Sequence, residues 1–198
     1  RPIDCLDIAN IIGENVVSGG VRRTAEIMLI DSDDKECIQA KSELYKKVGD
    51  TWVIDSEISH RQMSNNSIYY RSKPTREHLR WHLNEMRRSG EPGWVNAEAG
   101  AKRRPNFNGV NPCAEILLDS NGLCNLTTIN TAAFAKDGKL DKEGLLEAQR
   151  LSARAGYRMT FTELELPDWN KVHQRDKLIG CSLTGWQDMV NACNLTRE

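Results

Sequence analysis

Asn111-Pro112-Cys113-Ala114-Glu115 places an amide, a thiol and a carboxylate at alternate positions of one short segment. In an extended backbone such positions point to the same side, so we expect Asn111, Cys113 and Glu115 to face one ligand. Pro112 would stiffen the approach to the thiol. The segment therefore predicts a reaction centre. The alternative is that Cys113 is a small buried residue at a strand end, which is the usual place of a free cysteine.

A second thiol follows eleven residues later, in Gly122-Leu123-Cys124-Asn125-Leu126. Both thiols lie among polar and turn-forming residues, where a reactive cysteine is more common than in an apolar run. The chain has six cysteines in 198 residues, which is not the density of a disulfide-stapled domain. Cys-x-x-Cys does not occur, and the four histidines do not cluster with the thiols in the sequence, so we expect no protein-bound metal.

The overall composition excludes several classes of partner. The 27 basic residues almost balance the 28 acidic ones, so we expect neither nucleic acid nor a membrane surface to bind. No run approaches the ~18 apolar residues of a membrane span, and the first residues lack a signal-peptide core. These observations favour a cytoplasmic protein.

Two further segments are candidate binding elements. In Ser18 to Ala25, Gly19 and Gly20 allow a close backbone approach to a ligand, and Arg22 and Arg23 can reach a phosphate or a base edge. The spacing matches neither a P-loop nor a dinucleotide fingerprint. The alternative is an ordinary turn before a strand with solvated arginines.

The second segment lies at the mouth of a predicted strand that ends at Tyr70. Its small polar residues, Ser64 and Asn65 among them, can hold a sugar or a phosphate. They can equally build an Asx turn. The sequence leaves both readings open.

Strands alternate with helices along the chain. The patterns predict strands at 25–30, 52–54, 126–130 and 178–183, and helices at 5–12, after the caps Thr75 and Asp141, and near 186–190. Residues 31–50 read as surface, and His82 reads as a packed histidine rather than a ligand. The pattern is that of an α/β protein, in which sites form at one rim of the sheet or barrel.

The motif at 111–115 resembles the active-site finger loop of the ribonucleotide reductase catalytic subunit. The segment 18–23 resembles that family's specificity loop, and Cys124 to Asn130 resembles the strand that carries its second redox cysteine. The eleven-residue separation of the thiols and the segments 63–67 and 179–188 are similar to the adenosylcobalamin-dependent class. The resemblance implies part of a ten-stranded α/β barrel.

The same resemblance implies a mechanism. Adenosylcobalamin would generate a thiyl radical on Cys113, which would take the 3′ hydrogen of the ribose. Glu115 would be the general base on the 3′ hydroxyl, and Asn111 would hold the ribose oxygens. Cys124 would help to protonate the departing 2′ hydroxyl and would end as half of a disulfide. The implied partners are a ribonucleoside tri- or diphosphate, a deoxynucleotide effector at the specificity loop, and a thioredoxin-like reductant.

Several parts of a complete reductase are not recognisable in the chain. We find no secure partner for Cys124, since Cys5 lies in an apolar run and Cys37 in an acidic turn, while Cys181 and Cys193 read as structural thiols. Shuttle cysteines and a cobalamin-binding region are also missing. We therefore expect residues 1–198 to be the central part of a single α/β barrel catalytic domain, inactive in isolation, with the partner of Cys124 and most of the cobalamin site outside the chain.

Two other functions fit fewer residues. A catalytically silent nucleotide-binding module would keep the glycine-arginine loop without using Cys113. A thiol hydrolase would pair Cys113 with a histidine, although no histidine lies near the motif in the sequence.

Overall fold

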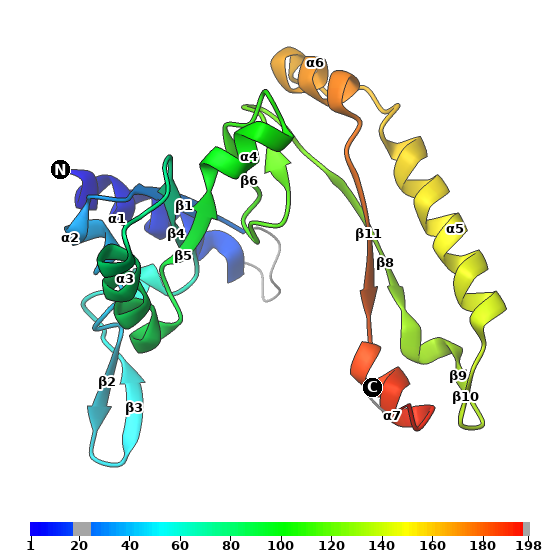
Figure 1. The fold of residues 1–198 in the computed structure, drawn as a ribbon, viewed down its shortest axis with the longest axis horizontal. Helices are drawn as coiled ribbons and strands as arrows, with labels where there is room; N and C mark the ends of the chain where they lie inside the picture. Colours follow the sequence, from blue (N-terminus) through cyan, green and yellow to red (C-terminus); the bar gives the residue numbers. More distant parts are fainter. Residues whose placement is uncertain (18–24, 196–198) are drawn as a thin grey trace. The chain divides into compact units, whose positions relative to one another are not determined.

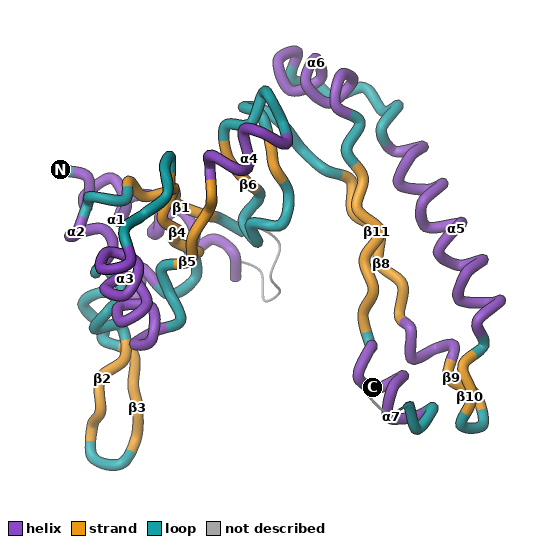
Figure 2. The backbone as a smooth tube through the Cα atoms, in the orientation of Figure 1, coloured by secondary structure: helices purple, strands orange, loops and turns teal. Residues whose placement is uncertain are grey.

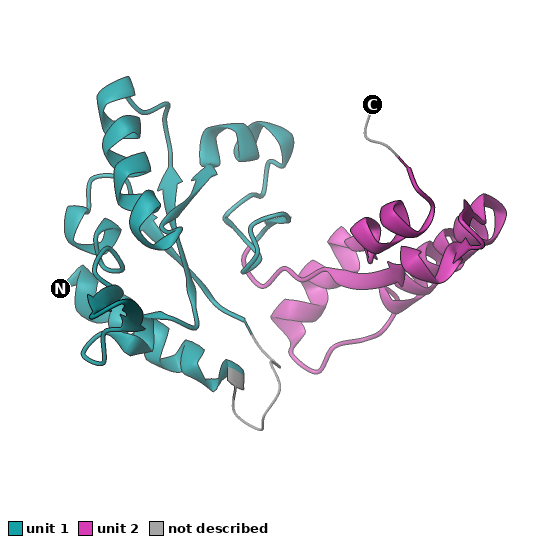
Figure 3. Cartoon of the chain, turned by 90° about the horizontal axis from the view of Figure 1, so that it is seen from below, with its two compact units in different colours: residues 1–119 teal, residues 120–198 magenta. Residues whose placement is uncertain are grey.

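The computed structural model describes residues 1–17 and 25–195, which form two compact units, residues 1–119 and 120–198 (Figure 3). Gly19, Gly20, Arg22 and Arg23 of the predicted specificity loop lie outside the described residues. Each unit is described by itself.

A three-stranded parallel sheet is the centre of the first unit. Its strands are β1 (Ile27–Asp31), β4 (Asn65–Tyr70) and β5 (Gly93–Asn96), in the order β1-β4-β5 (Figure 1). The alternation of side chains along β4 supplies both faces. Ile68 and Tyr70 belong to one apolar cluster, whereas Tyr69 packs against another.

The first cluster joins the sheet to helices α1 (Pro2–Gly13) and α2 (Lys35–Ile38). It includes Leu6, Cys37 and Ile38, all of which are buried. The interpretation of residues 31–50 as surface is therefore wrong for five buried residues, Cys37, Ile38, Ala40, Lys41 and Leu44. The short helix α2 turns Cys37 and Ile38 into this core. Helix α1 is present as predicted, but Ile8, Ile11 and Ile12 are exposed.

Helix α3 (Arg76–Ser89) has the ends that the sequence predicts. The Thr75 side chain accepts a hydrogen bond from the His78 backbone N–H at 3.1 Å, and Gly90 ends the helix with a φ of 85°. His82 is fully buried, as expected, and its Nε2 lies 2.9 Å from the Pro92 carbonyl oxygen. A carbonyl only accepts, so Nε2 carries the proton and Nδ1 accepts from the Tyr70 hydroxyl at 3.0 Å.

The remaining elements of the first unit are short. They are η1 (Glu14–Val17), the hairpin of β2 (Tyr45–Val48) and β3 (Thr51–Ile54), η2 (Ser59–Arg61), α4 (Ala97–Arg103), and the hairpin of β6 (Gly109–Val110) and β7 (Leu117–Leu118). The second apolar cluster, formed by Val95, Ala97 and Phe107, packs against residues of β6 and β7. It thereby attaches the β6–β7 hairpin to the sheet.

The second unit pairs β8 (Asn125–Asn130) in parallel with β11 (Ile179–Thr184), and α5 (Lys142–Met159) packs on both (Figure 2). Asp141 caps α5 through the Gly144 N–H at 2.9 Å, as predicted. The other elements are η3 (Thr131–Phe134), β9 (Ala135–Lys136), β10 (Lys139–Leu140), α6 (Pro167–Asp176) and α7 (Trp186–Ala192). Helix α6 is not among the predicted helices.

Candidate active site

The motif at 111–115 forms the loop between β6 and β7. The Asn111 side-chain Oδ1 accepts from the Ile116 N–H at 2.9 Å, and the Asn111 carbonyl accepts from the Ala114 N–H at 2.8 Å. Ala114 has a φ of 65°, in the left-handed region. The expectation of an extended backbone is therefore wrong, because these bonds close a tight turn. The loop leaves the side chains of Cys113 and Glu115 exposed.

Cys113 lines a cavity of about 390 Å³ at the edge of the sheet where the parallel strands begin. Asn65 and Gly93, the first residues of β4 and β5, also line it, together with Pro112. A side chain at Gly93 would meet the Ser67 hydroxyl at 2.7 Å, so the glycine keeps this region open. The volume is in the range of small-molecule sites.

Asn65 connects the sheet to the cysteine loop. Its side-chain Nδ2 donates to the carbonyl oxygen of Pro112 at 2.6 Å. Because the residue after Pro112 is Cys113, this bond holds the backbone next to the thiol. Its predicted role in binding a sugar or phosphate stays a prediction.

Ser64 is almost fully buried, and its hydroxyl donates to the side chain of Asn10 on α1. Its carbonyl accepts from the ammonium of Lys41, which also pairs with Glu91. Burial lowers the pKa of Lys41, an effect that Glu91 opposes. Sequence reasoning missed Lys41 and Glu91, since no local pattern marks a lysine whose partner is fifty residues away.

Cys124 immediately precedes β8 in the second unit and is half-buried. Its thiol lies 3.8 Å from the carbonyl oxygen of Asn125. On the neighbouring strand, a side chain at Gly180 would come within 3.9 Å of the Cys124 sulfur and 2.5 Å of Leu126. The absence of a side chain at Gly180 thus leaves space beside this thiol.

All six cysteines are free thiols, and they differ in exposure. Cys5 and Cys113 are exposed, Cys181 is half-buried in β11, and Cys193 is buried. Cys37 is buried rather than in a surface turn, and burial raises the pKa of its thiol to about 12. Cys113 thus combines exposure with a position on a cavity.

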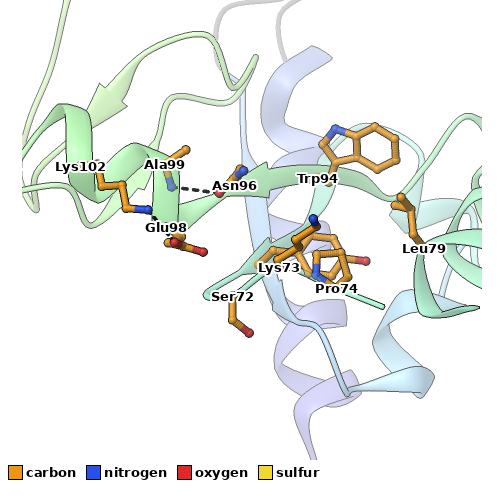
Figure 4. A pocket seen from close by; sticks show the side chains of 10 residues that line it. Ser72, Lys73, Pro74, Leu79, Trp94, Asn96, Glu98, Ala99 and Lys102 are labelled. Atoms are coloured by element: carbon orange, nitrogen blue, oxygen red, sulfur yellow. Dashed lines mark hydrogen bonds and ion pairs between the residues drawn. The ribbon is translucent and has the colours of Figure 1, made fainter. Parts of the chain in front are cut away.

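A second cavity, of about 430 Å³, lies at the carboxyl ends of β4 and β5 (Figure 4). Tyr70, Leu79 and Trp94 give it a mainly apolar wall, and Lys102 is paired with Glu98 at 2.6 Å. No thiol lines this cavity, so the cavity beside Cys113 is the candidate site.

Within residues 1–17 and 25–195, no group of three or more histidine, cysteine or acidic side chains is arranged to hold a metal ion. In the same part of the chain, no helix has the length and apolar character needed to cross a membrane.

The fold and the site together describe part of an α/β protein with a thiol on a loop at the sheet edge. The family model of the ribonucleotide reductase barrel domain matches residues 19–196. The chain belongs to the ribonucleotide reductase family, and its fold is part of that barrel domain.

Individual relatives carry more specific names. The chain is 32% identical over 204 residues to the adenosylcobalamin-dependent ribonucleoside-triphosphate reductase of Lactobacillus acidophilus, and 31% identical over 195 residues to that of Lactobacillus gasseri. Each match covers 95% of this chain and 25% of the relative. A crystal structure of a B12-dependent (class II) ribonucleotide reductase matches with a TM-score of 0.72 and 28% identity, over 98% of this chain and 26% of that one. The chain thus spans about a quarter of the length of these relatives.

Proposed function

We propose that the protein carrying this chain reduces ribonucleotides to 2′-deoxyribonucleotides, and so supplies precursors for DNA replication. The observation that carries the proposal is the exposed Cys113 thiol, on a loop hydrogen-bonded to the sheet edge and beside a cavity that suits a small molecule. Membership of the ribonucleotide reductase family and the names of the relatives support the same reaction.

Cys113 is the residue that takes the 3′ hydrogen atom as a thiyl radical and later returns it. Glu115 accepts the proton of the 3′ hydroxyl, for which its exposed carboxylate is accessible. Cys124 donates a proton to the departing 2′ hydroxyl, which leaves as water. Two electrons come from Cys124 and a second thiol outside the chain, and the two sulfurs end as a disulfide.

Asn111 has a narrower role than its residue type alone implies. Its Oδ1 is occupied by the Ile116 N–H, so the amide can serve a ligand through the Nδ2 hydrogens. Asn111 therefore acts as a donor to a ribose oxygen while its own oxygen maintains the loop.

The proposed cofactor is adenosylcobalamin, which the names of the relatives include. When bound, it would supply the radical that removes the hydrogen atom from the Cys113 thiol. The exposed position of this thiol fits such a reaction, because a buried thiol would be closed to the cofactor. The residues that hold the cofactor lie, in our proposal, mostly outside this chain.

The proposed substrate is a ribonucleoside triphosphate, following the names of the relatives, with a diphosphate as the alternative. A deoxynucleotide effector would act through Gly19, Gly20, Arg22 and Arg23, and Ser64 and Asn65 would belong to the substrate side. A thioredoxin-like protein would reduce the disulfide, which suits a cytoplasmic location because that compartment keeps dithiols reduced.

The test uses the full-length gene product with a ribonucleoside triphosphate, adenosylcobalamin and a dithiol reductant. We expect Cys113→Ser to lower kcat by about 10³-fold or more, since a serine hydroxyl does not form the radical under these conditions. Cys5→Ser is the matched control, because Cys5 is also an exposed thiol in the same unit. Full activity of the Cys113 variant would refute the assignment.

Nucleotide binding without turnover by the unaltered protein would favour the silent binding module. The 198-residue chain assayed alone is predicted to be inactive.

A further inference from the structure

We propose that Lys41, Glu91 and Asn65 form a positioning network that fixes the backbone of the Cys113 loop at the sheet edge. The inference deepens the proposed function and rests on it. None of the three residues is required to touch the substrate for this role. Each acts through the polypeptide that carries the thiol.

The network starts from a buried charge. The Lys41 side chain is 2% exposed, and its ammonium donates to the Ser64 carbonyl and to the Glu91 carboxylate. Removing an ammonium from water is costly unless it is paired, and a buried ion pair is often no more stabilising than an apolar pair of the same volume. The pair is therefore poorly explained by stability alone, whereas its directional bonds impose a geometry.

Glu91 uses both of its carboxylate oxygens. One pairs with Lys41, and the other accepts from the backbone N–H of Asn66 at 2.8 Å. The next residue, Pro92, has its carbonyl held by His82 of α3 at 2.9 Å. Glu91 thus joins the segment after α2 to the first residues of β4. The backbone that follows Glu91 is itself held by the bond between His82 and the Pro92 carbonyl.

Asn65 transmits this geometry to the loop. Its two neighbours are held by the pair, Ser64 through its carbonyl and Asn66 through its N–H, while its own N–H donates to the Glu26 carbonyl at 2.9 Å. The side chain can then reach only a limited region, where Nδ2 donates to the Pro112 carbonyl at 2.6 Å. That carbonyl belongs to the peptide bond that leads into Cys113.

The chemistry explains why such a tether matters. A hydrogen-atom transfer requires the sulfur and the donor carbon at a defined separation, and a misplacement of ~1 Å can lower a rate by about 100-fold. Because the thiol itself is exposed on a loop, its position depends on the backbone contacts of that loop. One of these contacts is the bond from Asn65 to the Pro112 carbonyl, and Asn65 is positioned in turn by Glu91 and the buried Lys41.

The experiment compares Glu91→Gln with Glu85→Gln in the full-length gene product. A glutamine at 91 presents one oxygen where the carboxylate serves two donors, so one of the bonds to Lys41 and Asn66 is lost. Glu85 is buried, whereas Glu91 is half-buried, and the Glu85 carboxylate accepts from the Ser42 hydroxyl, so Glu85→Gln is a control for the same change on α3. The first readout is the alkylation rate of Cys113 by iodoacetamide relative to that of Cys5. It is independent of turnover, so it tests the network even if the protein is not a reductase.

We expect Glu91→Gln to change the Cys113-to-Cys5 ratio by twofold or more, with Cys37 still protected, and Glu85→Gln to change it by less. In the assay of the proposed reaction, kcat should fall about tenfold or more with KM within twofold, because the substrate contacts remain. A change below twofold in the alkylation ratio would overturn the proposal and leave the pair a purely structural feature.

Glu91→Gln leaves a buried lysine poorly paired, and the variant can fail to fold, which labelling of Cys37 would reveal. Asn65→Ala then decides the question, since it removes the bond to Pro112 without unpairing a charge. It must also change the Cys113-to-Cys5 ratio by twofold or more with Cys37 protected, and a smaller change would overturn the proposal.

Discussion

The two units of the chain differ in how completely their sheets are covered. In the first unit, side chains on both faces of β4 belong to apolar clusters. In the second unit, Met189 and Cys193 are the buried apolar residues of its described part, while seven large apolar side chains are more than half exposed: Leu126, Leu146, Leu151, Tyr157, Phe161, Leu166 and Trp186.

Parallel strands are normally covered on both faces, so the second unit presents a surface that is suited to packing against further polypeptide. In the first unit, by contrast, the cavity beside Cys113 is lined by residues that hydrogen bonds within the unit hold in place. The position of Cys113 can therefore be set within residues 1–119, whereas the surroundings of Cys124 depend on what covers the second unit.

The largest expected difference between sites is in thiol reactivity. With a pKa of about 12, roughly one Cys37 thiol in 10⁴ is ionised at pH 8, since the two values differ by four units. We expect iodoacetamide to modify the exposed Cys5 and Cys113 at least about 10³-fold faster than Cys37. Peptide mass spectrometry of a timed reaction measures this. Comparable labelling of Cys37 would show that the first unit opens readily.

The next largest difference between the two units is expected in the free energy of unfolding when an apolar side chain is truncated. Ile68 is fully buried in the first unit, and Ile68→Ala should reduce the free energy of unfolding by about 2–5 kcal/mol. Leu146 is 63% exposed on α5, so Leu146→Ala should change it by less than about 0.5 kcal/mol. Urea unfolding followed by circular dichroism gives both values. A large loss for Leu146→Ala would mean that its face is covered in solution.

A buried hydrogen bond gives a smaller effect in the second unit. The Thr131 hydroxyl is buried and donates to the Thr184 carbonyl at 2.8 Å, which ties η3 to the end of β11. Thr131→Val keeps the shape but removes the donor, and should reduce the free energy of unfolding by about 1 kcal/mol. Thr128→Val is the control, since Thr128 is exposed on the same strand β8 that leads into η3. Equal effects of both changes would contradict the assigned role of Thr131.

The smallest effect concerns acid stability of the first unit. Hydrogen bonds from Arg61 lower the pKa of the half-buried Asp7, and His60 adds to the shift. A carboxyl group with a lowered folded pKa stabilises the fold above its unfolded pKa of about 3.9, and this contribution is lost as the pH falls through the folded value. Asp7→Asn should therefore be less stable at pH 7 and should lose less stability below pH ~4. If this account is wrong, thermal unfolding over a pH series would show the same loss of stability in acid for Asp7→Asn as for the unaltered protein.

Elements with local signals were predictable from the sequence. Thr75, Gly90 and Asp141 stop or start helices through contacts with residues three or four positions away, and such contacts can be read from a short window. The strands β1, β3, β8 and β11 also follow from their sequence patterns. Exposure of Cys113 agrees with its polar surroundings in the sequence.

The failures concern contacts between distant residues. The loop at 111–115 is closed by bonds that reach Ile116 and by the attachment to Asn65, neither of which alternation along a strand reveals. Lys41 is buried because Glu91 approaches it from another element, so its local sequence resembles a solvated surface. The catalytic roles of Asn111, Cys113, Glu115 and Cys124, and the single barrel domain proposed for 1–198, stay predictions.

The backbone of Ala114 limits how the cysteine loop can vary. A residue with a side chain at a φ of 65° carries a penalty of about 1–2 kcal/mol, and a branched β-carbon increases the crowding further. Glycine, asparagine or alanine is therefore admissible between Cys113 and Glu115, whereas valine or isoleucine would force the loop into another conformation. In a library randomised at position 114, we expect the functional variants to carry small or amide residues. The backbone conformation at this position thus limits which residue can stand between the thiol and the carboxylate.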